Sequence, residues 1–458
     1  MTIFLYFILY TLYFILFPQP ISAHAFGTLY TLPLPVWLYF YGGGAAVIIS
    51  FLVIGFFATE SGKESAVIGK YLFRIPGSLR FLAKIISLIL FFLVILSGFL
   101  GSQSPMENFN TNFFWIIFYL GFSYLCILIG NIWPAVNPWK IMAEFFGDLK
   151  PVFTYPKKLS YWPALICYFL LIWGELLSGG LAVRPKILSI LILFYSSLTF
   201  SGAYIFGKDW FKYGEFFSVF FNLISKVSPL EYKDGKVFLR IPFSELQQQT
   251  ALHFSQLFFI LFMLSSTAFD GFHSTTVWIK FYLGLVKTFG DISTMLQTAL
   301  LILSPIFFLT LYTVAIFLMK AWVNTKLSTP DLALKFAFSL IPIAVAYNIA
   351  HYYTLLLTQG QTIIALISDP FNKGWNLFGT ADYSINVGII GANFVWNSQV
   401  LIIVVGHIAA VFIAHFIALQ IFSQRKQALI SQLPMLILMV IYTVTGLWIL
   451  SQPLTGGG

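Results

Sequence analysis

Charged residues are scarce in this sequence. Only 9% of its 458 residues are Asp, Glu, Lys or Arg, whereas roughly a quarter of the residues of a soluble globular protein are charged. The 59% that are hydrophobic are gathered in apolar runs of about twenty residues, the length that crosses a bilayer core of roughly 30 Å. The runs lack the alternation of a membrane β-strand. The sequence therefore predicts an all-α, polytopic transmembrane helix bundle in a lipid bilayer.

Cysteine is almost absent, and the motifs of soluble enzymes are missing. Cys126 and Cys167 both lie in apolar runs, which excludes a disulfide framework and a thiolate metal site with ligand spacing. There is no Gly-rich phosphate loop, Gly-x-Ser-x-Gly elbow or His-Glu-x-x-His motif. The net charge of +9 comes from basic residues spread over many loops, so no nucleic-acid partner is expected.

About ten runs have the length of a membrane span. They are residues 36–58, 81–101, 113–133, 161–182, 187–207, 254–272, 292–319, 335–358, 394–422 and 433–452. Residues 24–458 are predicted to form one membrane domain. Its largest cytoplasmic segment is 208–245, in which aromatic residues alternate with lysines as in a helix lying in the membrane interface. A plain surface connector is the alternative there, and 359–393 is the largest periplasmic loop.

The first 23 residues are interpreted as a signal peptide or a signal anchor. A short apolar run is followed by small residues suited to cleavage after Ala23 or Ala25. The absence of Lys and Arg before the run leaves an uncleaved anchor as the alternative. Cleavage after Ala23 would make His24 the first residue, with an amine and an imidazole placed to bind copper.

The basic residues predict the orientation. If residue 24 lies outside, 20 of the 25 Lys and Arg residues fall in cytoplasmic segments, as the positive-inside rule requires. The chain is thus predicted to be a multi-pass protein of a bacterial inner membrane. Both the mature N-terminus and the C-terminus are predicted to be periplasmic.

Ionisable residues inside the spans are few, and they gather toward the periplasmic side. Glu175 and Asp270 are the two acidic residues in or at the edge of an apolar run. Asp270 and His273 share a helical face. Tyr347, Asn348 and His351 also share one, and His407 lies near the middle of its span. Because ionisable groups in hydrocarbon are costly, they usually mark function.

These residues form a candidate site for a transition metal: copper, zinc or iron. The expected ligands are His351, His407, His273 and His24. Asp270 and Glu175 are the expected catalytic residues, as ligands or general base. Asn348, Tyr347, Asp369 and Trp375 complete the polar site, with the 359–393 loop as a cover. In the alternative interpretation, each histidine is hydrogen-bonded to a neighbouring helix.

Several motifs resemble one group of bacterial polytopic membrane proteins. They include residues 32–38 (LPLPVWL), 206–210 (FGKDW), 269–271 (FDG), 346–352 (AYNIAHY), 406–407 (GH) and 431–434 (SQLP). Members of this family are often labelled fenitrothion hydrolase. The resemblance implies cleavage of an organophosphate ester, but no particular catalytic residues.

Three functions follow from these observations. The first is a membrane-embedded, metal-dependent hydrolase whose site opens to the periplasm. The second is an ion- or metal-coupled transporter, in which the same residues relay protons or ions. The third is a structural subunit that works with other subunits of a membrane complex.

Overall fold

Nine helical segments of the chain are long and apolar enough to cross a membrane. This count refers to the residues that the computed structural model describes, which are 35–57, 69–145, 147, 150–248, 250–290 and 293–452. The nine segments are α2 (Val36–Phe57), α3 (Gly77–Leu100), α4–η2–α5 (Phe109–Ile129), α9 (Pro185–Phe206), α12 (Phe254–His273), α14 (Ser293–Val323), α15–α17 (Thr329–Leu366), α18 (Ala392–Ile421) and α19 (Arg425–Ser451). The predicted all-α polytopic fold is confirmed, and the chain is a multi-pass membrane protein.

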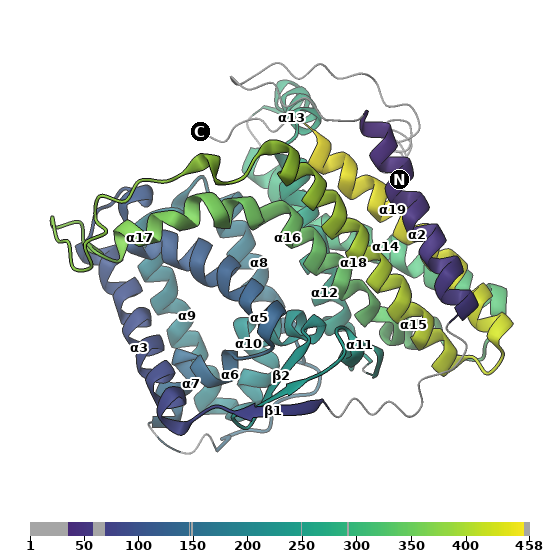
Figure 1. Ribbon diagram of the computed structural model, residues 1–458, viewed down its shortest axis with the longest axis horizontal. Coiled ribbons are helices and arrows are strands. Elements are labelled where there is room, and N and C mark those ends of the chain that lie inside the picture. Colours follow the sequence, from purple (N-terminus) through teal and green to yellow (C-terminus); the bar gives the residue numbers. More distant parts are fainter. Residues whose placement is uncertain are drawn as a thin grey trace.

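The helices form two groups around a buried centre (Figure 1). α3, α5, α8 and α9 lie on one side, and α2, α14, α18 and α19 lie on the other. Between them are α12 and the segment containing α16 (Ile341–Thr358), each with 78% of its apolar window buried, compared with 11% for α3. Polar residues on α12 and α16 are therefore shielded from lipid, whereas α3 is largely exposed to it.

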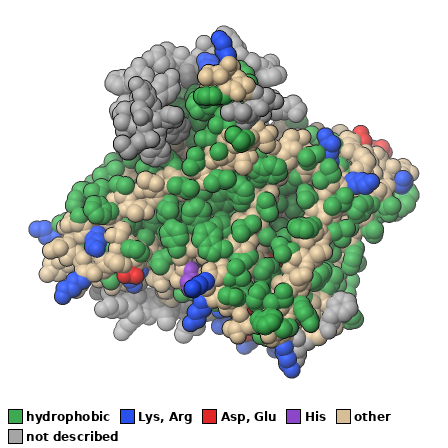
Figure 2. Space-filling model, turned by 180° about the vertical axis from the view of Figure 1, so that it is seen from behind, with side chains coloured by type: hydrophobic (Ala, Val, Ile, Leu, Met, Phe, Trp, Pro, Cys, Tyr) green, Lys and Arg blue, Asp and Glu red, His purple; other side chains and the backbone are tan. Residues whose placement is uncertain are grey.

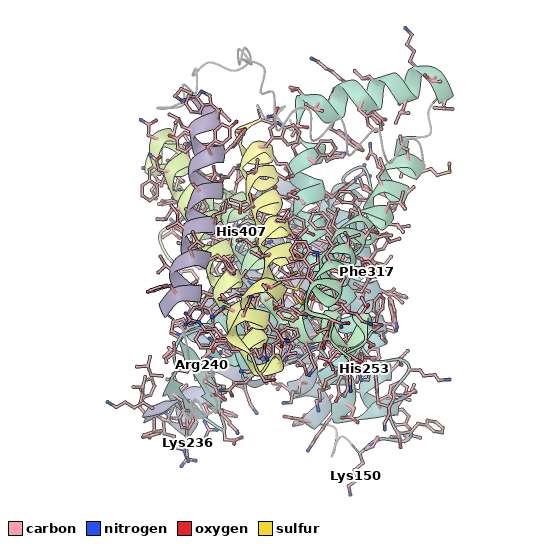
Figure 3. The ribbon with its side chains drawn as sticks, turned by 90° about the vertical axis from the view of Figure 1, so that its right-hand side faces the viewer. Lys150, Lys236, Arg240, His253, Phe317 and His407 are labelled. Atoms are coloured by element: carbon pink, nitrogen blue, oxygen red, sulfur yellow. The ribbon has the colours of Figure 1, made fainter. Side chains whose placement is uncertain are left out.

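The two ends of the bundle carry different elements. Helix α13 (Thr276–Phe289) lies across one end, and a three-stranded antiparallel sheet lies at the other (Figure 1). The strands are β1 (Lys70–Arg74), β2 (Leu230–Lys233) and β3 (Lys236–Leu239), in the order β1-β3-β2. We call these the α13 end and the sheet end. Lys150 and Lys236, both predicted to be cytoplasmic, lie at the sheet end (Figure 3).

One predicted span, 161–182, is shorter in the structure. It becomes α8 (Trp162–Leu176), 15 residues long, followed by a 3₁₀ turn (Leu181–Val183). The amide of Tyr161 donates to Ser255 Oγ at 3.1 Å, so α8 and α12 start side by side. At 1.5 Å per residue, α8 extends about 22 Å. α8 runs alongside α12, and part of its surface faces outward, because Ile166 and Leu170 are 56% and 54% exposed.

The aromatic part of segment 208–245 is buried in the protein, which differs from the expected helix in the membrane interface. Its buried aromatic residues are Trp210, Phe211, Phe216, Phe217, Phe220 and Phe221. The last four belong to α10 (Phe216–Ile224), which starts at the buried Glu215. The carboxylate of Glu215 accepts from the amides of Phe217 and Ser218 at 2.9 and 2.7 Å. This cap satisfies N–H groups of the first turn of α10, so that the start of the helix can be buried in the protein.

The remaining short elements connect the spans. They are η1 (Pro105–Glu107), α6 (Trp133–Val136), α7 (Pro138–Phe145), η4 (Trp210–Gly214), η5 (Ser225–Val227), α11 (Ser244–Gln248) and η8 (Val387–Ile389). Hydrophobic side chains cover most of the face shown in Figure 2, and many Lys and Arg side chains lie near its edges. That distribution fits a belt of lipid around the molecule.

Candidate functional site

The polar centre of the bundle is a hydrogen-bonded trio from two helices. On α12, the Oδ2 atom of Asp270 lies 3.0 Å from His351 Nε2. The same oxygen accepts a hydrogen bond of 2.6 Å from the hydroxyl of Tyr352. Both partners come from α16. The side chains of Asp270 and His351 are 15% and 14% exposed, so the pair is sheltered but not fully buried.

The local sequence explains why these side chains meet. Tyr347 and His351 are four residues apart and therefore share one face of α16. Gly271 follows Asp270 on α12; a side-chain Cβ at this glycine would lie 2.8 Å from Ile449, 3.3 Å from Tyr347 Oη and 3.5 Å from His351 Cε1. The missing side chain at Gly271 thus leaves room for the α16 side chains beside Asp270.

Two more ionisable groups surround the trio. Glu175, near the end of α8, lies close enough to Asp270 for their charges to interact. His273, one turn beyond Asp270, also interacts with it and faces Gln297 of α14. We call Glu175, Asp270, His273, His351 and Tyr352 the Asp270 cluster. It brings two carboxylates and two imidazoles from α8, α12 and α16 to one place.

Helix α13 closes one side of the Asp270 cluster. The ring of its Trp278 lies 5.2 Å from that of His273 and 6.0 Å from that of Phe269. Thr275 caps the helix by accepting from the amide of Trp278. In the predicted cover, the 359–393 loop, Phe371 lies beside Gly101 at the end of α3.

His407 lies outside the Asp270 cluster. Gly406 packs against Ala346 of α16, and His351 is five residues farther along that helix, or about 7.5 Å. His407 is buried at about mid-height of the bundle (Figure 3). Its Nδ1 lies 2.8 Å from the carbonyl oxygen of Ile403, and its Nε2 has no partner among the described residues. The expected joint role of His351 and His407 as ligands is therefore not supported by their positions.

The other predicted site residues have separate positions. Asp369 accepts hydrogen bonds from the amides of Lys373, Gly374 and Trp375, which fold its own exposed loop. The backbone carbonyl oxygen of Asn348 accepts a hydrogen bond of 3.3 Å from Tyr124 Oη. Asn348 also lines a small cavity of about 10 Å³. Tyr347 lies beside the cluster, but its buried hydroxyl has no partner in the described chain. His24 lies outside the described residues.

Tyr352 and a group of buried tyrosines were not singled out from the sequence. Tyr119 and Tyr168 are both buried and lie close enough to each other to interact. Tyr168 Oη lies 3.4 Å from Ser266 Oγ of α12. The sequence feature that could have identified Tyr352 is its position directly after His351 in an apolar span. Nothing in the sequence alone marks Tyr119 and Tyr168 among 23 tyrosines.

The described residues give no support for the metal centre expected from the sequence, and His24, one of its predicted ligands, lies outside them. Across the described ranges, no three His, Cys, Asp or Glu side chains are grouped so that they could hold a metal ion. What the cluster does provide is an acid–base pair, with a second carboxylate and a second imidazole nearby. A carboxylate that accepts the proton of one imidazole nitrogen orients the ring and makes the other nitrogen more basic.

Comparisons of the chain with protein-family models, with curated proteins and with solved structures find no match. The fold and the site define a class only: a multi-pass helical membrane protein with an Asp–His–Tyr cluster between its central helices.

Proposed function

We propose that the chain is a membrane-embedded hydrolase that uses the Asp270 cluster for general acid–base catalysis. The observation that supports this most is the Asp270–His351 pair, 3.0 Å apart and partly exposed. Asp270 accepts the Nε2 proton of His351, so that Nδ1 can take a proton from an attacking water. Glu175, the second carboxylate, supplies a proton to the leaving group. The resemblance to proteins labelled fenitrothion hydrolase suggests a phosphate ester as substrate.

The predicted orientation places this site on the periplasmic side. α12 starts near the sheet end, where Lys150 and Lys236 lie (Figure 3), and carries Asp270 toward the α13 end. A metal ion is not required by this proposal. Elemental analysis of the purified protein tests the metal predicted from the sequence, independently of the assay below.

Hydrolysis of fenitrothion by the detergent-purified protein, followed by release of its nitrophenol, tests the proposal. Asp270→Asn and Glu175→Gln should each lower the rate by about 10²-fold or more, the usual contribution of a general acid or base. Asp369→Asn is the matched control, because that carboxylate lies in an exposed loop. Equal rates in all three variants and the wild type would reject the proposal.

A proton-coupled transporter is the second candidate. It is favoured by the buried tyrosines, because Tyr119 lies close enough to both Tyr352 and Tyr168 to interact with them. Such hydroxyls can pass protons between the cluster and the small cavity lined by Tyr168 and Asn348. Proton uptake by proteoliposomes that fails with Tyr168→Phe, in a protein without hydrolase activity, would favour transport.

A further inference from the structure

A deep apolar groove lies on the opposite side of the molecule from α2 and α19. It has a volume of about 310 Å³ and lies between α3 and the helices that follow it. Its α3 wall consists of Ala83, Ile86, Ser87, Leu90, Phe91 and Val94. The facing wall includes Phe113, Phe118 and Phe122 of the π-helix η2 (Phe113–Phe122), together with Trp133 and Trp139. Both walls belong to membrane-spanning segments or to residues directly after them.

The back of the groove is fixed by hydrogen bonds. The indole of Trp139 donates to Ser196 Oγ at 2.8 Å, and that of Trp133 donates to Glu215 at 3.4 Å. Phe217 stacks on Trp139, with ring centres 5.8 Å apart. Ring positions held in this way give a preformed site, because little side-chain freedom is lost when a ligand binds.

The size of the groove matches one leaflet of a bilayer. From Ala83 to Val94 the α3 wall rises about 16 Å, which is close to half the roughly 30 Å of hydrocarbon. α3 has only 11% of its apolar window buried, so the groove opens toward lipid. The ligand that meets such a surface at this depth is a single acyl chain.

Basic residues stand at the sheet end of the groove. Lys84 lies directly after Ala83 and three residues before Ser87, at the level of the groove's first lining residue, and Arg80 lies one turn before Lys84 on α3. The Nε of Arg80 is buried and has no hydrogen-bond partner among the described residues. The guanidinium lies against Gly235 of the β2–β3 turn, and a positive charge with an unpartnered N–H at this end of α3 favours a phosphate group.

We propose that this groove binds one anionic phospholipid from the leaflet at the sheet end. The acyl chain fills the space between α3 and η2, and Arg80 and Lys84 bind the headgroup phosphate. This site is separate from the Asp270 cluster and does not depend on the hydrolase proposal.

Native mass spectrometry of the full chain in detergent, with phosphatidylglycerol or phosphatidylcholine of matched chains added, tests this proposal. The wild type should retain one phosphatidylglycerol. Leu90→Trp fills the groove and should weaken retention about tenfold, the effect of losing roughly two buried methylene groups. Ile89→Trp is the matched control, because Ile89 is 59% exposed on the neighbouring position of α3; it should bind as the wild type does.

The headgroup contact is tested by Arg80→Gln combined with Lys84→Gln. The double substitution should remove the preference for phosphatidylglycerol over phosphatidylcholine, whereas Lys150→Gln should leave that preference unchanged. If Leu90→Trp does not fold, Ala83→Leu is a milder filling variant. A wild type that retains no phosphatidylglycerol, or groove-filled variants that retain it fully, would overturn the proposal.

Discussion

Tyr347 and Tyr352 lie on the same helix, yet their hydroxyl groups have different surroundings. Tyr352 donates to the Asp270 carboxylate at 2.6 Å, whereas the buried hydroxyl of Tyr347 has no partner among the described residues. A hydrogen bond to a charged group is worth about 1.5–3 kcal/mol, and an unpaired hydroxyl contributes nothing favourable. The two tyrosines therefore allow a matched comparison at the site.

Tyr352→Phe should destabilise the protein by about 1.5–3 kcal/mol, because Asp270 loses a donor. Tyr347→Phe should leave stability unchanged or slightly raise it. Thermal unfolding in the same detergent at one scan rate measures both variants. Equal melting temperatures for the two variants would show that the Tyr352–Asp270 hydrogen bond does not form.

Residue counting along the spans predicted the depth of the polar side chains but not their lateral neighbours. Asp270, His351 and Tyr347 were expected on the same side of the membrane, and the structure brings them together. His407 was predicted near the middle of its span, and the contact between Gly406 and Ala346 agrees with that deeper position. Which side chains meet between helices depends on how the helices pack. The hydrophobic periodicity of a single sequence does not show this packing.

At the scale of elements, the sheet end is held by a buried ion cluster. Glu245 of α11 pairs with Lys226 and Arg240, whose side chains are only 6% and 5% exposed. Arg240 also donates to the carbonyl oxygens of Ser228 and Ser225 at 2.9 and 2.8 Å. Burial opposes ionisation of Glu245, but the two cations more than offset this and hold its pKa below the ordinary value of 4.5. This cluster joins α11 to the sheet.

Glu245→Gln should destabilise the protein by about 3–5 kcal/mol near neutral pH, because two buried cations lose their partner. Since the pKa of Glu245 is lowered in the folded state, its stabilisation is fully present above the ordinary carboxyl pKa. It is lost as the pH falls through the folded value. The difference in melting temperature between wild type and variant should therefore shrink in acid below pH 4.5. A difference that stays constant with pH would contradict this account.

Glu215 plays a similar role for α10. Besides capping the helix, it accepts hydrogen bonds from Tyr195 Oη and from Asn137 Nδ2, the latter at 3.3 Å. Glu215→Gln should lower stability by about 1–3 kcal/mol, because an amide N–H₂ then faces these donors. Glu144→Gln is the control: its pair with Lys140 is exposed and 3.8 Å long, so the effect should stay below about 0.5 kcal/mol. Similar shifts in both variants would argue against a special role for Glu215.

The elements missed at the sequence level lack the hydropathy signal of a span. α10 is a short run rich in phenylalanine, with Lys212 before it and Lys226 after it. This pattern is shared by interfacial and buried helices, and only the packing around Glu215 distinguishes the two. The β2–β3 hairpin has a readable signal, because Asp234 and Gly235 both adopt positive φ in its turn and Asp-Gly favours such turns. The sequence also carries a signal for α13, because Thr275 is a good helix cap and precedes an amphipathic run that includes Trp278.

At the scale of the whole molecule, the apolar periodicity was sufficient to predict the fold. In hydrocarbon the backbone must satisfy its own hydrogen bonds, which leaves helices once a β-barrel is excluded by the lack of alternation. Composition and run length therefore predict most of the architecture. The exception is α8, a helix of 15 residues where the sequence predicts a span over residues 161–182. The apolar run continues past Leu176 into the 3₁₀ turn (Leu181–Val183), so hydropathy does not show where the regular helix ends.

Single cysteines should report the orientation of the chain. Lys186→Cys and Lys373→Cys should react with a membrane-impermeant thiol reagent from the periplasmic side. Lys150→Cys and Lys236→Cys should react only after lysis. Cys126 is buried and Cys167 is half-buried in an apolar helix, so the native background should be low. Labelling of Lys186→Cys only after lysis would show that the chain does not pass to the other side between α7 and α9.

The most direct test of the Asp270 cluster compares His351→Ala with His407→Ala in one assay of fenitrothion hydrolysis, with thermal unfolding as a check on folding. His351 touches Asp270, whereas His407 lies about a turn or more deeper and bonds only to its own helix. The account predicts a loss of about 10²-fold or more for His351→Ala and near-normal turnover for a folded His407→Ala. Equal losses in the two variants, or none in His351→Ala, would contradict it.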